Sequence, residues 1–117
     1  MNNKTNIEYK GTSYELIFNL NVMELIQEEY GRVEAWGALT DNAAEPNAKA
    51  VKFGIAAMLN EGIDIYNDDN VGKADYIERK PFTLNQVGRL ITEIGLNNIA
   101  EKLNKTVVDS TASDEKN

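Results

Sequence analysis

The spacing of the apolar residues changes at Asn19, and this change constrains the fold more than any other feature of the sequence. Before Asn19 two short segments are apolar at every second position, and the residues concerned are Ile7, Tyr9, Tyr14, Leu16 and Phe18. Such alternation is typical of β-strands with one buried face. A two-residue turn at Lys10-Gly11 would place Ile7 opposite Tyr14 and bring the apolar side chains onto one face. We therefore predict a β-hairpin over residues 5–18.

After Asn19 the apolar residues recur every three or four positions, which is typical of amphipathic helices. The pattern predicts five short helices, which cover residues 20–30, 33–39, 48–60, 83–94 and 96–107. Gly31 and Gly95 stand where helices commonly end. Thr83 and Gln86 have the spacing of a capping box, which predicts a helix start.

Two residues of the helical region predict close packing. Trp36 is the only tryptophan of the chain and lies in a short amphipathic segment. We interpret it as a core residue rather than an interface anchor. Gly54 lies in the middle of an apolar helical segment, where glycine is unfavourable by about 0.5–1 kcal/mol relative to alanine. Its presence predicts that a neighbouring element approaches the helix closely.

Two polar stretches interrupt or follow the helical pattern. Residues 63–80 hold most of the turn-forming residues, and the flanks 63–66 and 75–77 can pair as a second small hairpin. After Val108 the sequence DSTASDEKN has no apolar residue larger than alanine, which predicts a flexible acidic tail over residues 109–117. The predicted fold class is α+β, mainly α, with an N-terminal β-hairpin followed by about five short helices (20–108) in one globular domain over residues 1–108.

The polar segment around Asp68 invites comparison with a calcium-binding EF-hand loop. When Asp68, Asn70 and Gly72 are aligned with the ligand positions, Lys73 takes the place of the required glycine and Arg79 takes the place of the bidentate glutamate. We therefore interpret this segment as a solvated turn and predict no metal site.

The chain has no histidine and no cysteine. It therefore lacks the commonest general base, the commonest metal ligand and the thiolate nucleophile. No glycine belongs to a G-x-G-x-x-G or P-loop spacing. Carboxylates across a substrate cleft remain a possible catalytic set, but such clefts usually belong to larger domains. We predict a binding protein that is not an enzyme, with no catalytic, cofactor-binding or metal-binding residues.

The charge of the chain bears on its partners. Nineteen acidic and twelve basic residues give a net charge of −7, which opposes binding to phosphate backbones, so we expect no nucleic-acid partner. No apolar run approaches the roughly 18 residues that span a bilayer, so we expect no membrane insertion. The N-terminal residues lack the apolar segment of a secretory signal, and we expect the protein to stay in the cytoplasm.

Four stretches of the sequence together resemble one family, the tail assembly chaperones of long-tailed bacteriophages and of prophages of Gram-positive bacteria. They are IEYKGTSYELIFNLNVMELIQEEYG, VEAWGALTD, KFGIAAMLNEGIDI and PFTLNQVGRLITEIGLNNIAEKLN. The resemblance extends over residues 6–108 and rests on core and capping residues rather than on a catalytic signature. The segment 67–79 does not contribute to it and looks like a variable insertion.

The resemblance implies a protein that binds the tape-measure protein in the host bacterial cytoplasm and keeps it soluble while tail tube subunits polymerise around it. The tail tube protein is then a further possible partner, and the chaperone is absent from the mature virion. Members of the family are often oligomeric and are often accompanied by a longer, frameshifted form. The codons of the last residues, Glu115-Lys116-Asn117, would show whether a slippery heptamer exists here.

Two functions of other classes stay open at the level of sequence. The first is a structural tail or head-tail component that remains in the virion. The second is an acidic inhibitor that mimics DNA, which would need carboxylates concentrated on one face. Glu24, Glu28, Glu29 and Glu34 cluster somewhat, whereas the other acidic residues are spread along the chain. The residues that contact a partner, and the number of subunits, are not identified by the sequence.

Overall fold

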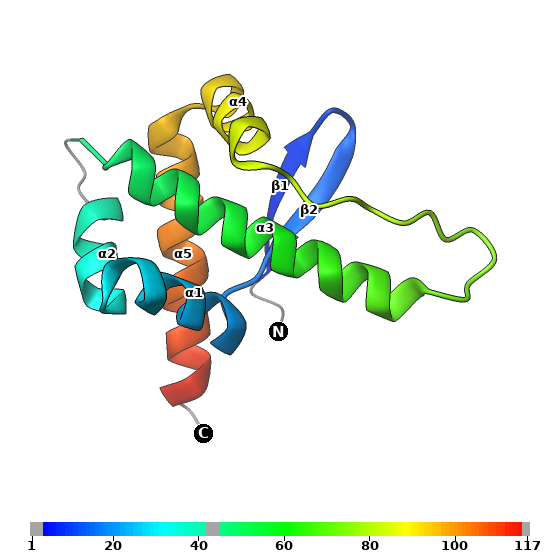
Figure 1. The fold of residues 1–117 in the computed structure, drawn as a ribbon, viewed down its shortest axis with the longest axis horizontal. Coiled ribbons are helices and arrows are strands. Elements are labelled where there is room, and N and C mark those ends of the chain that lie inside the picture. The colour runs from blue at the N-terminus through cyan, green and yellow to red at the C-terminus, as the bar shows by residue number, and fades with distance from the viewer. Residues whose placement is uncertain (1–3, 42–44, 116–117) are drawn as a thin grey trace.

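The computed structural model describes residues 4–41 and 45–115 and shows a β-hairpin followed by five helices (Figure 1). The elements, in chain order, are β1 (Thr5–Tyr9), β2 (Thr12–Leu16), α1 (Leu20–Tyr30), α2 (Val33–Thr40), α3 (Ala48–Asn70), α4 (Leu84–Ile94) and α5 (Leu96–Glu115). The predicted fold class, α+β with an N-terminal hairpin and mainly helical, is confirmed.

The hairpin has the register that the alternating pattern predicts. Ile7 is paired with Tyr14 across the two antiparallel strands. Lys10 and Gly11 have φ angles of 51° and 80°, so both turn residues are in the left-handed region that a two-residue turn with the twist of the strands requires. Ile7 and Leu16 are buried, which places the apolar face of the hairpin against the helices.

Helix α3 is the centre of the molecule, and the hairpin and the other four helices all contact it (Figure 1). Its side chains Ile55, Met58 and Leu59 are fully buried. Trp36 of α2 is 1% exposed, as predicted for a core residue, and its Nε1 donates a hydrogen bond to the Ala50 carbonyl oxygen at 3.0 Å. Burial of one large apolar side chain stabilises the fold by about 1.5–3 kcal/mol. The buried side chains of α3 therefore contribute much of the stability of the core.

Helix α3 is longer than the sequence pattern indicates. We predicted an end between Asn60 and Gly62, but the helix continues to Asn70, so the predicted small hairpin of 63–66 with 75–77 is wrong. Gly62 does not stop the helix; it makes room for the backbone carbonyl of Glu15, which a Cβ atom at this position would contact. Ile63 is 1% exposed, so burial continues past the glycine.

The C-terminal helices begin as predicted, and α4 also ends where predicted, whereas α5 ends later. Thr83 and Gln86 form the complete capping box at the start of α4, and Gly95, with φ of 110°, separates α4 from α5. We predicted that regular structure ends at Val108, but α5 continues to Glu115. The Ser110 hydroxyl donates to the Phe18 carbonyl oxygen at 3.0 Å, which ties this extension to the chain that leaves the hairpin. The last two residues of the predicted tail lie outside the described part.

Candidate functional site

Two asparagine side chains of α3 hold the segment that connects α3 with α4. The Asn60 amide donates to the Phe82 carbonyl oxygen at 3.0 Å and accepts from the Phe82 backbone N–H at 2.8 Å. The Asn67 amide forms the same reciprocal pair with Arg79, at 2.9 and 3.0 Å. The two asparagines are seven positions apart and therefore lie on one face of the helix. They fix an extended strap over residues 79–82 along α3.

Aromatic contacts join this strap to the hairpin. The ring of Phe82 meets the rings of Tyr9 and Tyr14 edge-on, with centroids 6.2 and 5.2 Å apart. The guanidinium carbon of Arg79 lies 3.7 Å from the ring centroid of Tyr66, a cation–π arrangement, and its Nη1 donates to a carbonyl oxygen of β2 at 3.3 Å. The strap is therefore held from both sides, and Phe82 is fixed where the strap reaches α4.

An open groove lies between α1, α3 and the end of the strap. It has a volume of about 340 Å³. Apolar side chains from three separate parts of the chain form its floor and walls, and these are Leu25, Phe53, Ala56, Ala57, Phe82 and Leu84. Leu25 and Leu84 are 45% and 51% exposed, which is unusual for large apolar side chains beside a core. This is a hollow apolar surface that residues 4–41 and 45–115 leave open.

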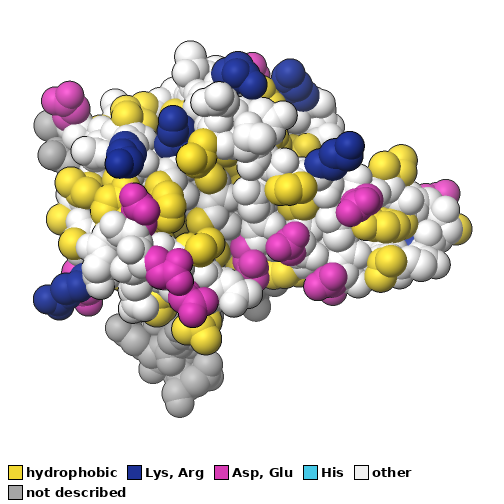
Figure 2. Space-filling model, viewed as in Figure 1, with side chains coloured by type: hydrophobic (Ala, Val, Ile, Leu, Met, Phe, Trp, Pro, Cys, Tyr) yellow, Lys and Arg dark blue, Asp and Glu magenta, His cyan; other side chains and the backbone are white. Residues whose placement is uncertain are grey.

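Carboxylates border this groove. Glu61 and Asp64 line it, and Glu28 and Glu29 follow Leu25 by three and four positions and share its face of α1. None of the four forms an ion pair with a described lysine or arginine. Figure 2 shows Asp and Glu side chains gathered over α1 and α3 with hydrophobic side chains between them. We call this surface the acid-rimmed groove; it comprises the apolar floor, the lining carboxylates Glu61 and Asp64, and Glu28 and Glu29 on the same face of α1 as Leu25.

Hydrogen bonds of Glu61 join two walls of the groove, α1 and α3. Glu61 accepts hydrogen bonds from the side-chain amides of Asn19 and Asn21, at 2.8 and 3.1 Å. Asn19 also caps α1, since its side chain accepts from the Val22 backbone N–H at 3.2 Å. The same residues therefore start α1 and join it to α3.

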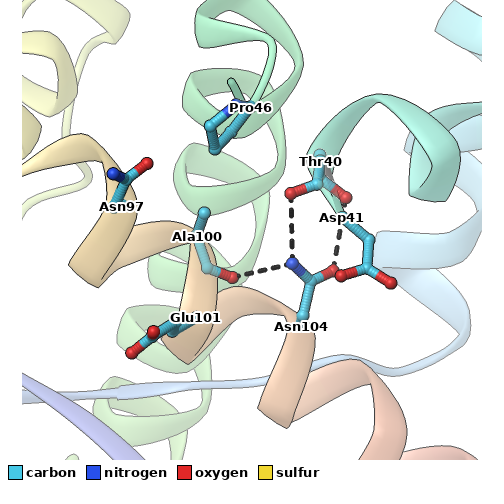
Figure 3. A pocket seen from close by; sticks show the side chains of 7 residues that line it. All are labelled: Thr40, Asp41, Pro46, Asn97, Ala100, Glu101 and Asn104. Carbon is cyan, nitrogen blue, oxygen red and sulfur yellow. Dashed lines mark hydrogen bonds between the residues drawn. The ribbon is translucent and has the colours of Figure 1, made fainter. Parts of the chain in front are cut away.

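A second, polar pocket lies where the end of α2 meets α5, with a volume of about 350 Å³ (Figure 3). Asn104 occupies its centre, and its amide donates to the carbonyl oxygens of Thr40 and Ala100 at 3.1 and 2.9 Å. The Thr40 hydroxyl contacts the Asn104 side-chain oxygen at 3.4 Å. These hydrogen bonds join the end of α2 to α5.

Two side-chain oxygens of the described residues are buried without a hydrogen-bond partner, Thr5 Oγ1 and the Tyr30 hydroxyl oxygen. The Tyr30 hydroxyl oxygen makes no hydrogen bond, and its ring packs edge-on against Phe53 at 5.7 Å. Burial, followed by the charge of Glu29, raises the pKa of Tyr30 above the ordinary value of 10.0. The phenol is therefore neutral at physiological pH.

The residues that the sequence pattern singled out lie in separate parts of the structure. Trp36 is in the core and away from any open surface. Asp68 and Asn70 belong to α3, and Gly72 follows its end, so they do not form a calcium loop. Among residues 4–41 and 45–115, no group of three or more carboxylates is placed to hold a metal ion. Within the same residues no helix combines the length and the hydropathy that crossing a bilayer requires.

The residues of the acid-rimmed groove were not predicted from the sequence. Leu25 carries the clearest signal, because it is an apolar residue on the polar face of an otherwise amphipathic helix. Leu84 stands in the first turn of α4 and carries no signal of its own. Comparison of the chain with protein-family models, with curated proteins and with solved structures finds no match.

Proposed function

We propose that this protein is a phage tail assembly chaperone that binds the tape-measure protein and keeps it soluble until the tail tube forms around it. The single observation that carries the proposal is the acid-rimmed groove, an uncovered apolar surface next to a well-packed core. A chaperone that holds an aggregation-prone chain needs such a surface, because apolar contact supplies most of the affinity for an unassembled partner.

Two further features support the proposal. The four sequence stretches that resemble tail assembly chaperones fall on the hairpin with α1, on α2, on α3 and on α4 with α5. The net charge of −7 favours solubility of a complex that carries an apolar partner. On this proposal the protein acts in the host cytoplasm, with the tail tube protein as a further possible partner, and is absent from the virion.

Co-expression with the tape-measure protein encoded by the same phage or prophage tests this function. The proposal predicts that the tape-measure protein moves from the insoluble to the soluble fraction and co-purifies with the chain. A protein of unrelated function but similar net charge serves as the control for nonspecific solubilisation. A tape-measure protein that stays insoluble, together with detection of the chain in purified virions by mass spectrometry, would instead identify a structural tail component.

A further inference from the structure

The geometry points to an amphipathic helix, with lysine or arginine beside its apolar stripe, as the segment that the acid-rimmed groove binds. This inference deepens the proposed chaperone function and rests on it for the identity of the natural partner. Two separate observations bear on the occupant. The backbone and the dimensions of the groove favour a helix, and the carboxylates of the groove favour positive charge on it.

The described backbone around the groove offers no edge for an added β-strand. A partner strand would need free backbone N–H and C=O groups at the groove, as in β-sheet augmentation. Both backbone groups of Phe82 are already paired with Asn60. The other walls come from α1, α3 and the first turn of α4, which are helical and offer no sheet edge. A helix, which satisfies its own backbone hydrogen bonds, therefore fits this surface better than an added strand.

The dimensions of the floor also suit a helix. Along α3 the groove extends from Phe53 to Asp64, which at 1.5 Å per residue is about 16 Å, or three helical turns. Ala56 and Ala57 stand in the middle of this length, and their small side chains allow a second helix to approach closely. Phe53 and Leu25 on one side, with Phe82 and Leu84 on the other, provide apolar contacts for side chains at i, i+3 and i+4.

The carboxylates of the acid-rimmed groove favour an occupant with positive charge. Glu28, Glu29, Glu61 and Asp64 carry negative charge with no described basic partner in an ion pair. An acidic helix on this floor would bring like charges together, whereas lysine or arginine on its flanks would meet opposite charge. Since these carboxylates are at least partly exposed, the attraction acts mainly on selectivity and association rate and weakens with salt.

Two synthetic peptides test the inference. Each has about 18 residues and the same leucine and alanine stripe, and they differ only in lysine against glutamate on the polar face. Binding of fluorescently labelled peptide to the full chain is followed by anisotropy. We expect the lysine peptide to bind at least about tenfold more tightly than the glutamate peptide at low ionic strength, and this ratio to shrink at about 1 M salt.

Paired variants locate the site. Leu25→Ser with Leu84→Ser removes exposed apolar contacts and should weaken binding of the lysine peptide by about tenfold or more. The matched control, Val71→Ser with Ile77→Ser, changes side chains that are 68% and 79% exposed outside the groove and should leave binding unchanged. Thermal unfolding of each variant confirms that the fold is retained.

A second pair of variants tests the rim without changing the floor. Glu28→Gln with Asp64→Asn should weaken the lysine peptide several-fold at low salt, whereas Glu8→Gln with Glu93→Gln, two exposed carboxylates on β1 and α4, should have little effect. Equal weakening by both pairs would mean that binding follows the net charge of the molecule and would overturn the inference. The inference would also be overturned if the glutamate peptide bound as tightly as the lysine peptide and the Leu25→Ser, Leu84→Ser variant weakened the binding of both peptides equally.

The two proposals fail in different ways. If the lysine peptide binds in the groove but the tape-measure protein is not solubilised, the chaperone function is wrong and the groove assignment stands. If the tape-measure protein is solubilised equally well by the Leu25→Ser, Leu84→Ser variant, the chaperone function stands and the groove assignment is wrong.

Discussion

The packing of Trp36 against α3 requires glycine at position 54. A Cβ atom at Gly54 would lie 2.5 Å from Trp36 Cζ2 and 3.1 Å from Leu103 Cδ1, and both of these side chains are buried. The sequence predicted a close approach at this glycine because glycine is otherwise unfavourable in an apolar helix. It did not identify the neighbour, since the contact joins α3 to α2 and α5 across the core.

This contact predicts the effect of alanine at two helical glycines. Gly54→Ala should lower the free energy of unfolding by about 1–3 kcal/mol, because the rigid indole of Trp36 has to move. Gly37→Ala in α2 is the matched control, since no atom lies within 4 Å of its Cβ position and the change should be neutral or stabilising by up to about 1 kcal/mol. Urea unfolding of both variants measures the difference. Equal stability of the two variants would show that Trp36 does not pack on Gly54 as described.

Helix α3 shows where sequence patterns succeed and where they fail at the scale of elements. The hairpin, the capping box at Thr83 and the helix break at Gly95 depend on residues close in sequence, and all three were predicted. The predicted end of α3 was wrong, because Gly62 and the polar residues after it, considered without the rest of the fold, resemble a turn. The helix continues because Gly62 accommodates the backbone of Glu15 and Asn67 binds the strap, and both contacts are remote in sequence.

The asparagine pairs of α3 predict that the strap detaches when one of them is removed. Asn60→Ala leaves the backbone N–H and C=O of Phe82 without their partner and should cost about 1–3 kcal/mol of stability. Asn85→Ala, at an exposed position of α4, is the matched control and should change stability by less than about 0.5 kcal/mol. Amide hydrogen exchange should also become faster at Phe82 in the first variant alone. Unchanged exchange at Phe82 would contradict the clamp.

At the scale of the whole molecule, the acid-rimmed groove forms only when three distant parts of the chain come together. Leu25 stands out in its own segment as an apolar residue on a polar face, but only folding places it with Phe53 and Leu84 around one hollow. Local patterns therefore predicted the hairpin and the order of the helices, but not this groove. The segregation of acidic side chains over α1 and α3 is likewise a property of the assembled surface (Figure 2).

The most direct measurement is hydrogen–deuterium exchange of the chain, free and in complex with the co-expressed tape-measure protein. The account predicts slower exchange on binding in α1 and in residues 53–64 of α3, with no change around the polar pocket at Thr40 and Asn104. Protection confined to that polar pocket or to the outer face of the hairpin, with α1 and α3 unchanged, would contradict the assignment of the groove as the partner-binding surface.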